Sequence, residues 1–457
     1  MHSLIRYSLA ATAVLSMAGG VSARPSAPRE GQLGQQNRIE RPAAVGGGGG
    51  GGAEAKVANA KALYFLTNDE DNAIAAIELG DNGLVTGKGA TYQTGGKGAN
   101  GIDGATNEKA APDALFSQSA LTVAGKHIFA VNAGSNTLSM FAIDPNNPLA
   151  LQKVGEDIQL PGEFPNTVAA SEKNGLVCVG MTGQKAGVAC ADFSAEGGLG
   201  QADGLREFQL NQTTPPVGPT NTVSQVFWSA DESQLLATVK GDPEKGNNGF
   251  FSAYAQQQQE GGNQADQAKA GKFRVSQEEI RSTPGGTAVL FGSVAIPGTQ
   301  DVLATDASFG VAILNEKQQQ KQYAAAARLE LPNQKATCWA TISPLTNTAF
   351  VTDVGRNMLI EVGYNANANG NGNGEGGEQG ELSLLNEIDL SSIGGPDLGL
   401  IDLRAAGEFV YALSPGAGTG EEAAINVIHA GTKQFVQNAR LTGVGAGKNS
   451  MGMAVYV

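Results

Sequence analysis

A short pattern of apolar strand, polar turn and apolar strand recurs seven times along the chain. The copies occupy residues 62–77, 127–144, 175–191, 234–254, 301–314, 349–362 and 408–428. Internal repetition constrains the fold strongly, because one such unit can bury its apolar faces only against its neighbours. Phe65 and Phe409 hold equivalent places in the first and seventh copies, which gives a mean period of about 57 residues.

The two ends of the repeat region indicate how the repeats close. Each hairpin after the first follows another short apolar or hydroxyl-rich segment, whereas the first follows a glycine-rich stretch. Residues 451–457 form a matching segment that has no hairpin of its own. We therefore predict an all-β, seven-bladed β-propeller in which the C-terminal strand joins the first blade. A pair of β-sandwiches is the alternative, but it explains neither the seven units nor the two unpaired end segments.

Glycine and low-complexity tracts account for the length of the repeats. Glycine supplies 64 of the 457 residues, about twice the usual share, and many of these glycines fall in the expected turns. A four-stranded repeat needs about 40–45 residues, so each unit carries extra sequence. The polar tracts 256–271, 317–327 and 365–380 supply much of it. We expect them to be surface loops within one propeller that spans residues 61–457.

The N-terminal 60 residues read as two segments outside the propeller. Arg6, the apolar run 7–18 and the small residues 21–23 are typical of a secretory signal peptide over residues 1–23. Residues 24–60 are rich in Gly, Pro and Gln, which predicts a disordered tail. The apolar run is shorter than the ~20 residues that a membrane-spanning helix needs. We therefore expect a secreted, extracellular protein without a membrane span.

Charge narrows the choice of partners. Thirty Lys and Arg against 44 Asp and Glu give a net charge of −14, which disfavours nucleic acid and anionic membranes. The acidic turn 69–71 lacks the alternating pattern of a calcium loop. We expect no metal, no cofactor and a monomeric chain.

Three cysteines in an exported chain leave at least one unpaired. Cys178 and Cys190 flank a turn-like run, so a cross-strand disulfide and two buried thiols both fit this spacing. Cys338 would be the odd, buried thiol. A zinc site is disfavoured, because His127 and His429 both lie far from the cysteine pair in sequence. Asn211 begins an Asn-Gln-Thr sequon, for which export makes glycosylation meaningful.

A propeller gathers the starts of its inner strands around one mouth of the central channel. Equivalent positions in the repeats nominate eight channel-mouth residues, which are Gln118, Asn166, Thr167, Asn221, Thr222, Trp339, Asp397 and Asn449. Neutral amides and hydroxyls suit a small polar ligand or a sugar. An anionic ligand would need arginines as well, and Arg206, Arg281, Arg356 and Arg404 are the scarce candidates. The alternative is that turns before strands simply favour Asn, Ser and Thr.

Particular stretches of the sequence resemble a known family. Residues 125–144 are similar to a blade of the lactonase-type seven-bladed propellers, which include 6-phosphogluconolactonase and fungal 3-carboxymuconate cyclases. Residues 175–190, 214–224 and 237–243 resemble secreted fungal 3-carboxymuconate cyclase-like proteins. The likeness runs from about residue 61 to the end, and the Pro-Pro-Val-Gly-Pro run at 215–219 is its most specific part.

The resemblance implies lactone or muconate chemistry in the channel. Enzymatic relatives place a histidine-rich stretch at the start of an inner strand, but the comparable stretch here, 164–168, holds no histidine. His127 falls within an alternating strand, where a structural role is expected. His429 ends the seventh hairpin, where a surface position is expected. The acid and base that such chemistry requires are not assigned by the sequence.

Two functions therefore stay open. The first is a secreted glycoprotein that binds a small polar ligand, glycan or extracellular matrix as an extracellular or cell-wall adhesive surface, with catalysis lost. The second is a lactonase or muconate cycloisomerase that acts in the channel.

Overall fold

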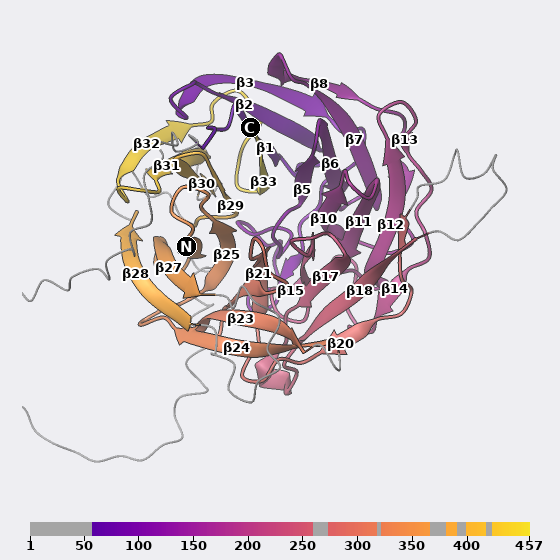
Figure 1. The fold of residues 1–457 in the computed structure, drawn as a ribbon. Helices are drawn as coiled ribbons and strands as arrows, with labels where there is room; N and C mark the ends of the chain where they lie inside the picture. Colours follow the sequence, from indigo (N-terminus) through magenta and orange to yellow (C-terminus); the bar gives the residue numbers. More distant parts are fainter. Residues whose placement is uncertain (1–56, 259–272, 318–320, 366–380, 391–398, 417–422) are drawn as a thin grey trace, which may run out of the picture.

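The computed structural model describes residues 57–258, 273–317, 321–365, 381–390, 399–416 and 423–457. These residues form seven sheets of four or five strands around a common axis, together with one two-stranded sheet near that axis (Figure 1). The predicted all-β, seven-bladed propeller is confirmed. Within the described part of the chain, the helical structure is the 3-10 turn Pro243–Lys245, and no helix is long and apolar enough to cross a membrane.

Blades 1, 5, 6 and 7 are four-stranded antiparallel sheets. Their strands are β1 (Ala62–Leu66), β2 (Ala73–Leu79), β3 (Val85–Gln93) and β33 (Met451–Tyr456) in blade 1; β21 (Leu290–Ala295), β22 (Val302–Asp306), β23 (Gly310–Lys317) and β24 (Gln322–Glu330) in blade 5; β25 (Thr337–Ile342), β26 (Ala349–Asp353), β27 (Met358–Asn365) and β28 (Glu381–Asp389) in blade 6; and β29 (Leu403–Ala406), β30 (Phe409–Ser414), β31 (Ala424–His429) and β32 (Phe435–Arg440) in blade 7.

Blades 2, 3 and 4 each have a fifth strand, because two strands share the outermost position. Their strands are β5 (Leu121–Ala124), β6 (His127–Asn132), β7 (Thr137–Asp144), β8 (Asn147–Lys153) and β9 (Ile158–Gln159) in blade 2; β10 (Pro165–Ser171), β11 (Leu176–Met181), β12 (Ala186–Ser194), β13 (Gly198–Leu199) and β14 (Arg206–Phe208) in blade 3; and β16 (Val223–Trp228), β17 (Gln234–Val239), β18 (Phe250–Gln258), β19 (Phe273–Val275) and β20 (Ile280–Ser282) in blade 4.

The C-terminal strand closes the propeller as predicted. β33 pairs antiparallel with β1, so that Leu63 lies opposite Val455 and Ala62 opposite Tyr456. This pairing gives blade 1 its innermost strand and leaves β1 without an open edge, which is how a closed all-β ring avoids exposed edges.

Burial follows the position of each strand within a blade. The second and third strands are almost entirely buried, as in the fully buried β30, because both faces of each sheet pack against neighbouring blades. The outermost strands alternate or are mainly exposed, as in β28. The core therefore lies between the blades, and polar sequence is tolerated at the rim.

This tolerance corrects one expected loop. The tract 317–327 was predicted to be a surface loop, but residues 322–330 form β24, which pairs with β23 along its length. An outermost strand needs only half-buried side chains, and the alanines at 324–327 meet that need. Residues 256–258 and residue 365 likewise end β18 and β27. The rest of 256–271 and 365–380, the expected signal peptide and most of the expected tail lie outside the described residues.

Candidate functional site

The connection between blades 1 and 2 leads the chain into the centre of the propeller. This connection, residues 94–120, contains β4 (Ile102–Asp103), which pairs in parallel with β15 (Val217–Gly218) from the loop before blade 4. The ring of Phe116 packs against Gly101 and Gly218, where an added Cβ would lie 2.2 and 2.6 Å from ring atoms. Both positions therefore need glycine for the chain to pass.

Residues 113–119 of this connection, hereafter the axial segment, are all buried and lie among the inner strands. The amide group of Asn166 on β10 donates to the carbonyl of Leu115 at 3.1 Å and to that of Val223 at 2.7 Å. From blade 6, Trp339 Nε1 donates to the carbonyl of Ser117 at 3.1 Å. The axial segment thus joins blades on opposite sides of the axis (Figure 1).

Gln118 makes the densest set of these contacts. Its amide group donates to the carbonyl of Ala340 and accepts from the N–H of Ala340, both at 3.0 Å. Its main-chain N–H donates to the carbonyl of Ser224 at 2.9 Å, and its carbonyl accepts from Thr167 Oγ1 at 2.8 Å. A Cβ at position 292 would lie 2.3 Å from Gln118 Oε1, so Gly292 makes room for this amide.

A buried lysine is bonded to the axial segment. Lys240 Nζ donates to the carbonyl of Phe116 at 2.5 Å and to Ser224 Oγ at 3.3 Å, and it lies 4.3 Å from the centre of the Phe291 ring. Burial lowers the pKa of the Lys240 ammonium to about 8, and the nearby carboxylate of Asp113 opposes that shift.

A buried carboxylate holds the end of the axial segment. Asp402 accepts from the N–H groups of Ser119 at 3.0 Å and Met453 at 3.1 Å. Arg404 pairs with Asp402 at 2.7 Å and donates to Ser119 Oγ at 2.8 Å. Burial raises the pKa of the Asp402 carboxyl, while Arg404 opposes the shift. Of the four scarce arginines, Arg404 is thus at the centre and is bonded to the chain itself.

The structure brings four of the eight channel-mouth residues together around the axial segment. Gln118, Asn166, Thr167 and Trp339 are at most 2% exposed. Their polar groups are bonded to the chain, except that the buried Asn166 Oδ1 accepts no hydrogen bond from a described residue. Their binding of a ligand stays a prediction.

The other channel-mouth residues take part in loop contacts. Thr222 is buried and donates to the carbonyl of Pro219, and the half-buried Asn221 donates to the carbonyl of Leu210. Asn449 accepts from Asn100 and donates to Asp69. Asp397 lies outside the described residues.

The two histidines among the described residues occupy structural positions away from the axial segment. His127 on β6 packs edge-on against Phe193 with ring centres 6.0 Å apart, and burial lowers its pKa. His429 Nδ1 accepts from the N–H groups of Gly431 and Thr432 and so supports the turn after β31.

The cysteines resolve the alternatives left by their spacing. Cys178 and Cys190 are opposite each other on β11 and β12 and form a disulfide, with Cα atoms 4.0 Å apart. Cys338 is a buried free thiol whose pKa is raised by burial. Asn211 of the predicted sequon is exposed, and its glycosylation stays a prediction.

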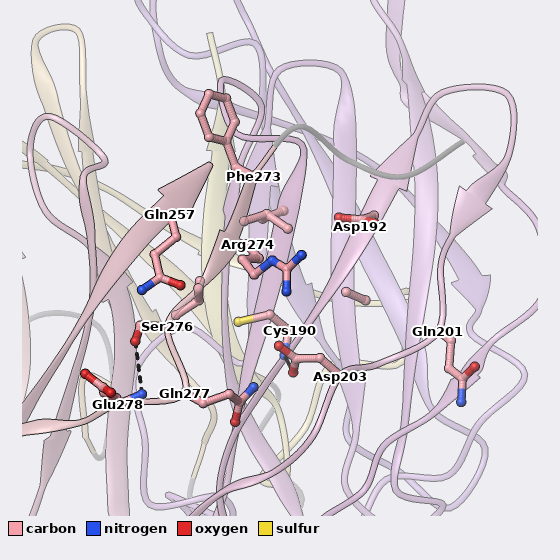
Figure 2. Close-up of a pocket in the computed structure, with 13 residues that line it drawn as sticks. Cys190, Asp192, Gln201, Asp203, Gln257, Phe273, Arg274, Ser276, Gln277 and Glu278 are labelled. Carbon is pink, nitrogen blue, oxygen red and sulfur yellow. Dashed lines mark hydrogen bonds between the residues drawn. The ribbon is translucent and has the colours of Figure 1, made fainter. Parts of the chain in front are cut away.

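A cavity of about 490 Å³ lies elsewhere, between the outer parts of blades 3 and 4 (Figure 2). Its lining includes Cys190 and Asp203 from blade 3 and Arg274 and Gln277 from blade 4. This volume is within the usual range for small-molecule sites. The molecule thus has a filled centre and an open groove near its rim.

Sequence reasoning missed the axial segment and this groove. The long gap between the first two hairpins, about residues 94–120, was a usable signal for the segment, and Lys240 directly after a buried strand was another. The groove left no comparable signal, because its side chains come from short, irregular strands of two blades.

Comparison with known proteins places the fold. No family model and no curated protein sequence match the chain. Among solved structures, the periplasmic gluconolactonase of Pseudomonas aeruginosa aligns with a TM-score of 0.55 and 14% identity over 86% of this chain and 99% of that one. A candidate 6-phosphogluconolactonase from Bacteroides fragilis gives 0.54 and 11% over 87% and 98%. A protein of unknown function from Desulfotomaculum acetoxidans gives 0.51 and 11% over 87% and 99%. The chain therefore shares the propeller fold of these solved structures.

Proposed function

We propose that this chain is a secreted extracellular or cell-wall glycoprotein that binds a small polar ligand, glycan or matrix through an adhesive surface, with lactone chemistry lost. One observation carries the proposal. At the channel mouth, where the resemblance places the chemistry, the chain's own axial segment accepts hydrogen bonds from side-chain donors of the inner strands, including the N–H groups of Asn166 and Trp339.

Energetics support a closed centre. A substrate at these groups would have to displace the axial segment and leave buried donors and acceptors unpaired, at about 1–3 kcal/mol each. Gln118 alone would give up its bonds to Ala340, Ser224 and Thr167. Binding at the outer surface requires no such displacement.

The arrangement of titratable groups also supports the proposed loss of catalysis. General acid–base chemistry needs a group within hydrogen-bond reach of the substrate, with a pKa near the working pH. Lys240 has a suitable pKa, but the residue is 1% exposed and its ammonium is bonded to Phe116 and Ser224. His127 and His429 pack against aromatic side chains of blades 3 and 7 instead.

The test uses purified full-length protein in two assays. In the first, we expect hydrolysis of glucono-1,5-lactone and cyclisation of carboxymuconate to proceed no faster than with heat-unfolded protein. In the second, we expect saturable binding of the protein to isolated cell walls or to immobilised matrix. Turnover above the control would overturn the loss of catalysis. Absence of binding to both surfaces would overturn the adhesive role.

A lactonase or cycloisomerase is the second candidate, and the fold shared with a gluconolactonase favours it. Under this alternative the axial segment would have to move, and Lys240 would be the group with a suitably lowered pKa. Turnover that is lost in Lys240→Met, while the circular dichroism spectrum is retained, would favour this candidate.

A further inference from the structure

The groove between blades 3 and 4 exists because two outermost strands are interrupted at the same level. In blade 3, β14 pairs with residues 186–188 of β12 and β13 pairs with 193–194, so residues 200–205 lie outside the ladder. In blade 4, β20 pairs with residues 251–253 of β18 and β19 pairs with 256–258. Residues at or next to both interruptions, such as Gln201 and Ser276, line the cavity.

A buried arginine fixes the base of this groove. Arg206 is 4% exposed and crosses from blade 3 to blade 4, where it donates to the carbonyls of Ser276 at 2.6 Å and Val275 at 2.7 Å. Its Nη1 and Nη2 donate to the two carboxylate oxygens of Asp203 at 3.1 and 2.8 Å. Asp203 Oδ1 also accepts from the N–H of Cys190. The base is therefore rigid and its central charges are matched, as a preformed site requires.

The side chains above this base are polar and project from both blades (Figure 2). Gln201 comes from blade 3, and Gln257, Arg274 and Gln277 come from blade 4. Within the described ranges, none of these four side chains makes a hydrogen bond to the protein. Phe273 is half-buried and adds an aromatic surface at the edge. The groove thus offers donors and acceptors that the protein does not use itself.

The charge balance selects among ligands. Asp203 is neutralised by Arg206, and the lining also holds Arg274 and Glu278, one charge of each sign. A polyanion would meet the Glu278 carboxylate, and a polycation would meet the Arg274 guanidinium. Amide groups both donate and accept, carboxylates accept and guanidinium donates, so the set matches the adjacent hydroxyls of a sugar, each of which can donate and accept.

We propose that this groove binds a neutral oligosaccharide. The inference rests on the binding role proposed above and adds a site and a ligand class to it. Gln257 and Arg274 contact the sugar hydroxyls from blade 4, Gln201 contacts them from blade 3, and the Phe273 ring packs against an apolar sugar face.

Calorimetric titration of the full-length protein tests this site. The probes are laminarihexaose, chitohexaose and mannohexaose, with oligogalacturonate as the anionic comparison and oligolysine as the cationic one. At least one neutral probe is expected to bind saturably. Affinity is expected to fall about tenfold or more in Gln257→Ala/Arg274→Ala, because a hydrogen bond to a charged group and one to an amide are lost. The matched control is Gln152→Ala/Lys126→Ala, which changes an exposed Gln and an exposed cation of blade 2.

The outcomes separate this site from the general binding role. Equal affinity of the groove variant, the control and the unchanged protein would overturn the groove while leaving a binding protein. Preference for oligogalacturonate or oligolysine, or failure of all three neutral probes, would overturn the ligand class. Loss of wall and matrix binding in the earlier assay would instead overturn the proposed function itself. Both variants should unfold at the same midpoint as the unchanged protein, since their side chains lie at the surface.

Discussion

Polar side chains gather in two regions of this propeller, and the regions differ in what satisfies them. At the axis, Gln118 and Trp339 are buried and bonded to main-chain groups of distant blades. In the outer groove, Gln257 and Arg274 make no side-chain hydrogen bond to another described residue. Residue type alone does not separate structural from ligand-binding roles. Burial and existing partners do, because a bonded buried amide stabilises the fold whereas an exposed unpaired one is available to a ligand.

Truncating a large aromatic side chain in each region should give the greatest difference in the loss of unfolding free energy. Trp339→Ala empties a fully buried site that packs against Phe291 at 4.7 Å, and we expect a loss of about 3–5 kcal/mol of unfolding free energy. Phe273→Ala in the half-buried groove should cost less than about 1 kcal/mol. Guanidinium unfolding followed by circular dichroism measures both. Equal costs would contradict the comparison, and Trp339→Phe should recover most of the loss.

The same substitution in both regions isolates the role of hydrogen bonding. Gln118→Ala leaves the buried N–H and carbonyl of Ala340 without their partner, which should cost about 2–3 kcal/mol. Gln257→Ala removes an amide without a described partner and should change stability by no more than about 0.5 kcal/mol. Unfolding midpoints of the two variants provide the measurement. A stable Gln118→Ala protein would mean that water enters the axis and replaces the amide.

The smallest expected effect is a pH dependence of the axial region. The pKa of Lys240 is about 8 in the folded protein and about 10.5 when unfolded, so between these values the unfolded chain binds more protons. Stability therefore rises with pH through this window as the buried charge is lost. From pH 7 to 9 the gain is about 1 kcal/mol.

Lys240→Met should remove this rise, and the difference between the two stability curves cancels the contributions of other groups. Urea titrations at pH 7, 8 and 9 provide the data. The exposed Lys126 provides the control. Lys126→Met should leave the curve of unfolding free energy against pH parallel to that of the unchanged protein. Parallel curves for Lys240→Met as well would show that its ammonium is hydrated in the folded state.

The fold was largely predictable because the same strand pattern recurs seven times, so that an ambiguous assignment in one copy is settled by the others. Seven buried hairpins and the orphan segment 451–457 identified both the blade number and the closure. Residues 322–327 were mistaken for part of a loop, because an outermost strand carries little hydrophobic signal. The spacing of Cys178 and Cys190 fitted both a disulfide and two free thiols. In the structure the two residues lie directly opposite each other on β11 and β12, and they form the disulfide.

The candidate sites were predictable only in part. Strand starts nominated Asn166, Thr167 and Trp339, and all three are hydrogen-bonded to residues 117–118, while their binding of a ligand stays a prediction. Their hydrogen-bond partners were not predictable, because those are main-chain atoms of a connection whose path depends on the assembled ring. The groove depends on where the outermost strands of blades 3 and 4 are interrupted relative to each other in the assembled ring. Sequence periodicity contains no information on this relative position.

The pairing of β1 with β33 has a consequence for the order of folding. These strands are separated by almost the entire propeller, so β1 emerges from the ribosome long before its partner exists. Until then the first blade has an exposed edge that could pair with another chain. Ring closure is a non-local event of high contact order, and such events are slow. Blade 1 therefore reaches its full set of four strands only after the six residues of β33 have been synthesised and have paired with β1.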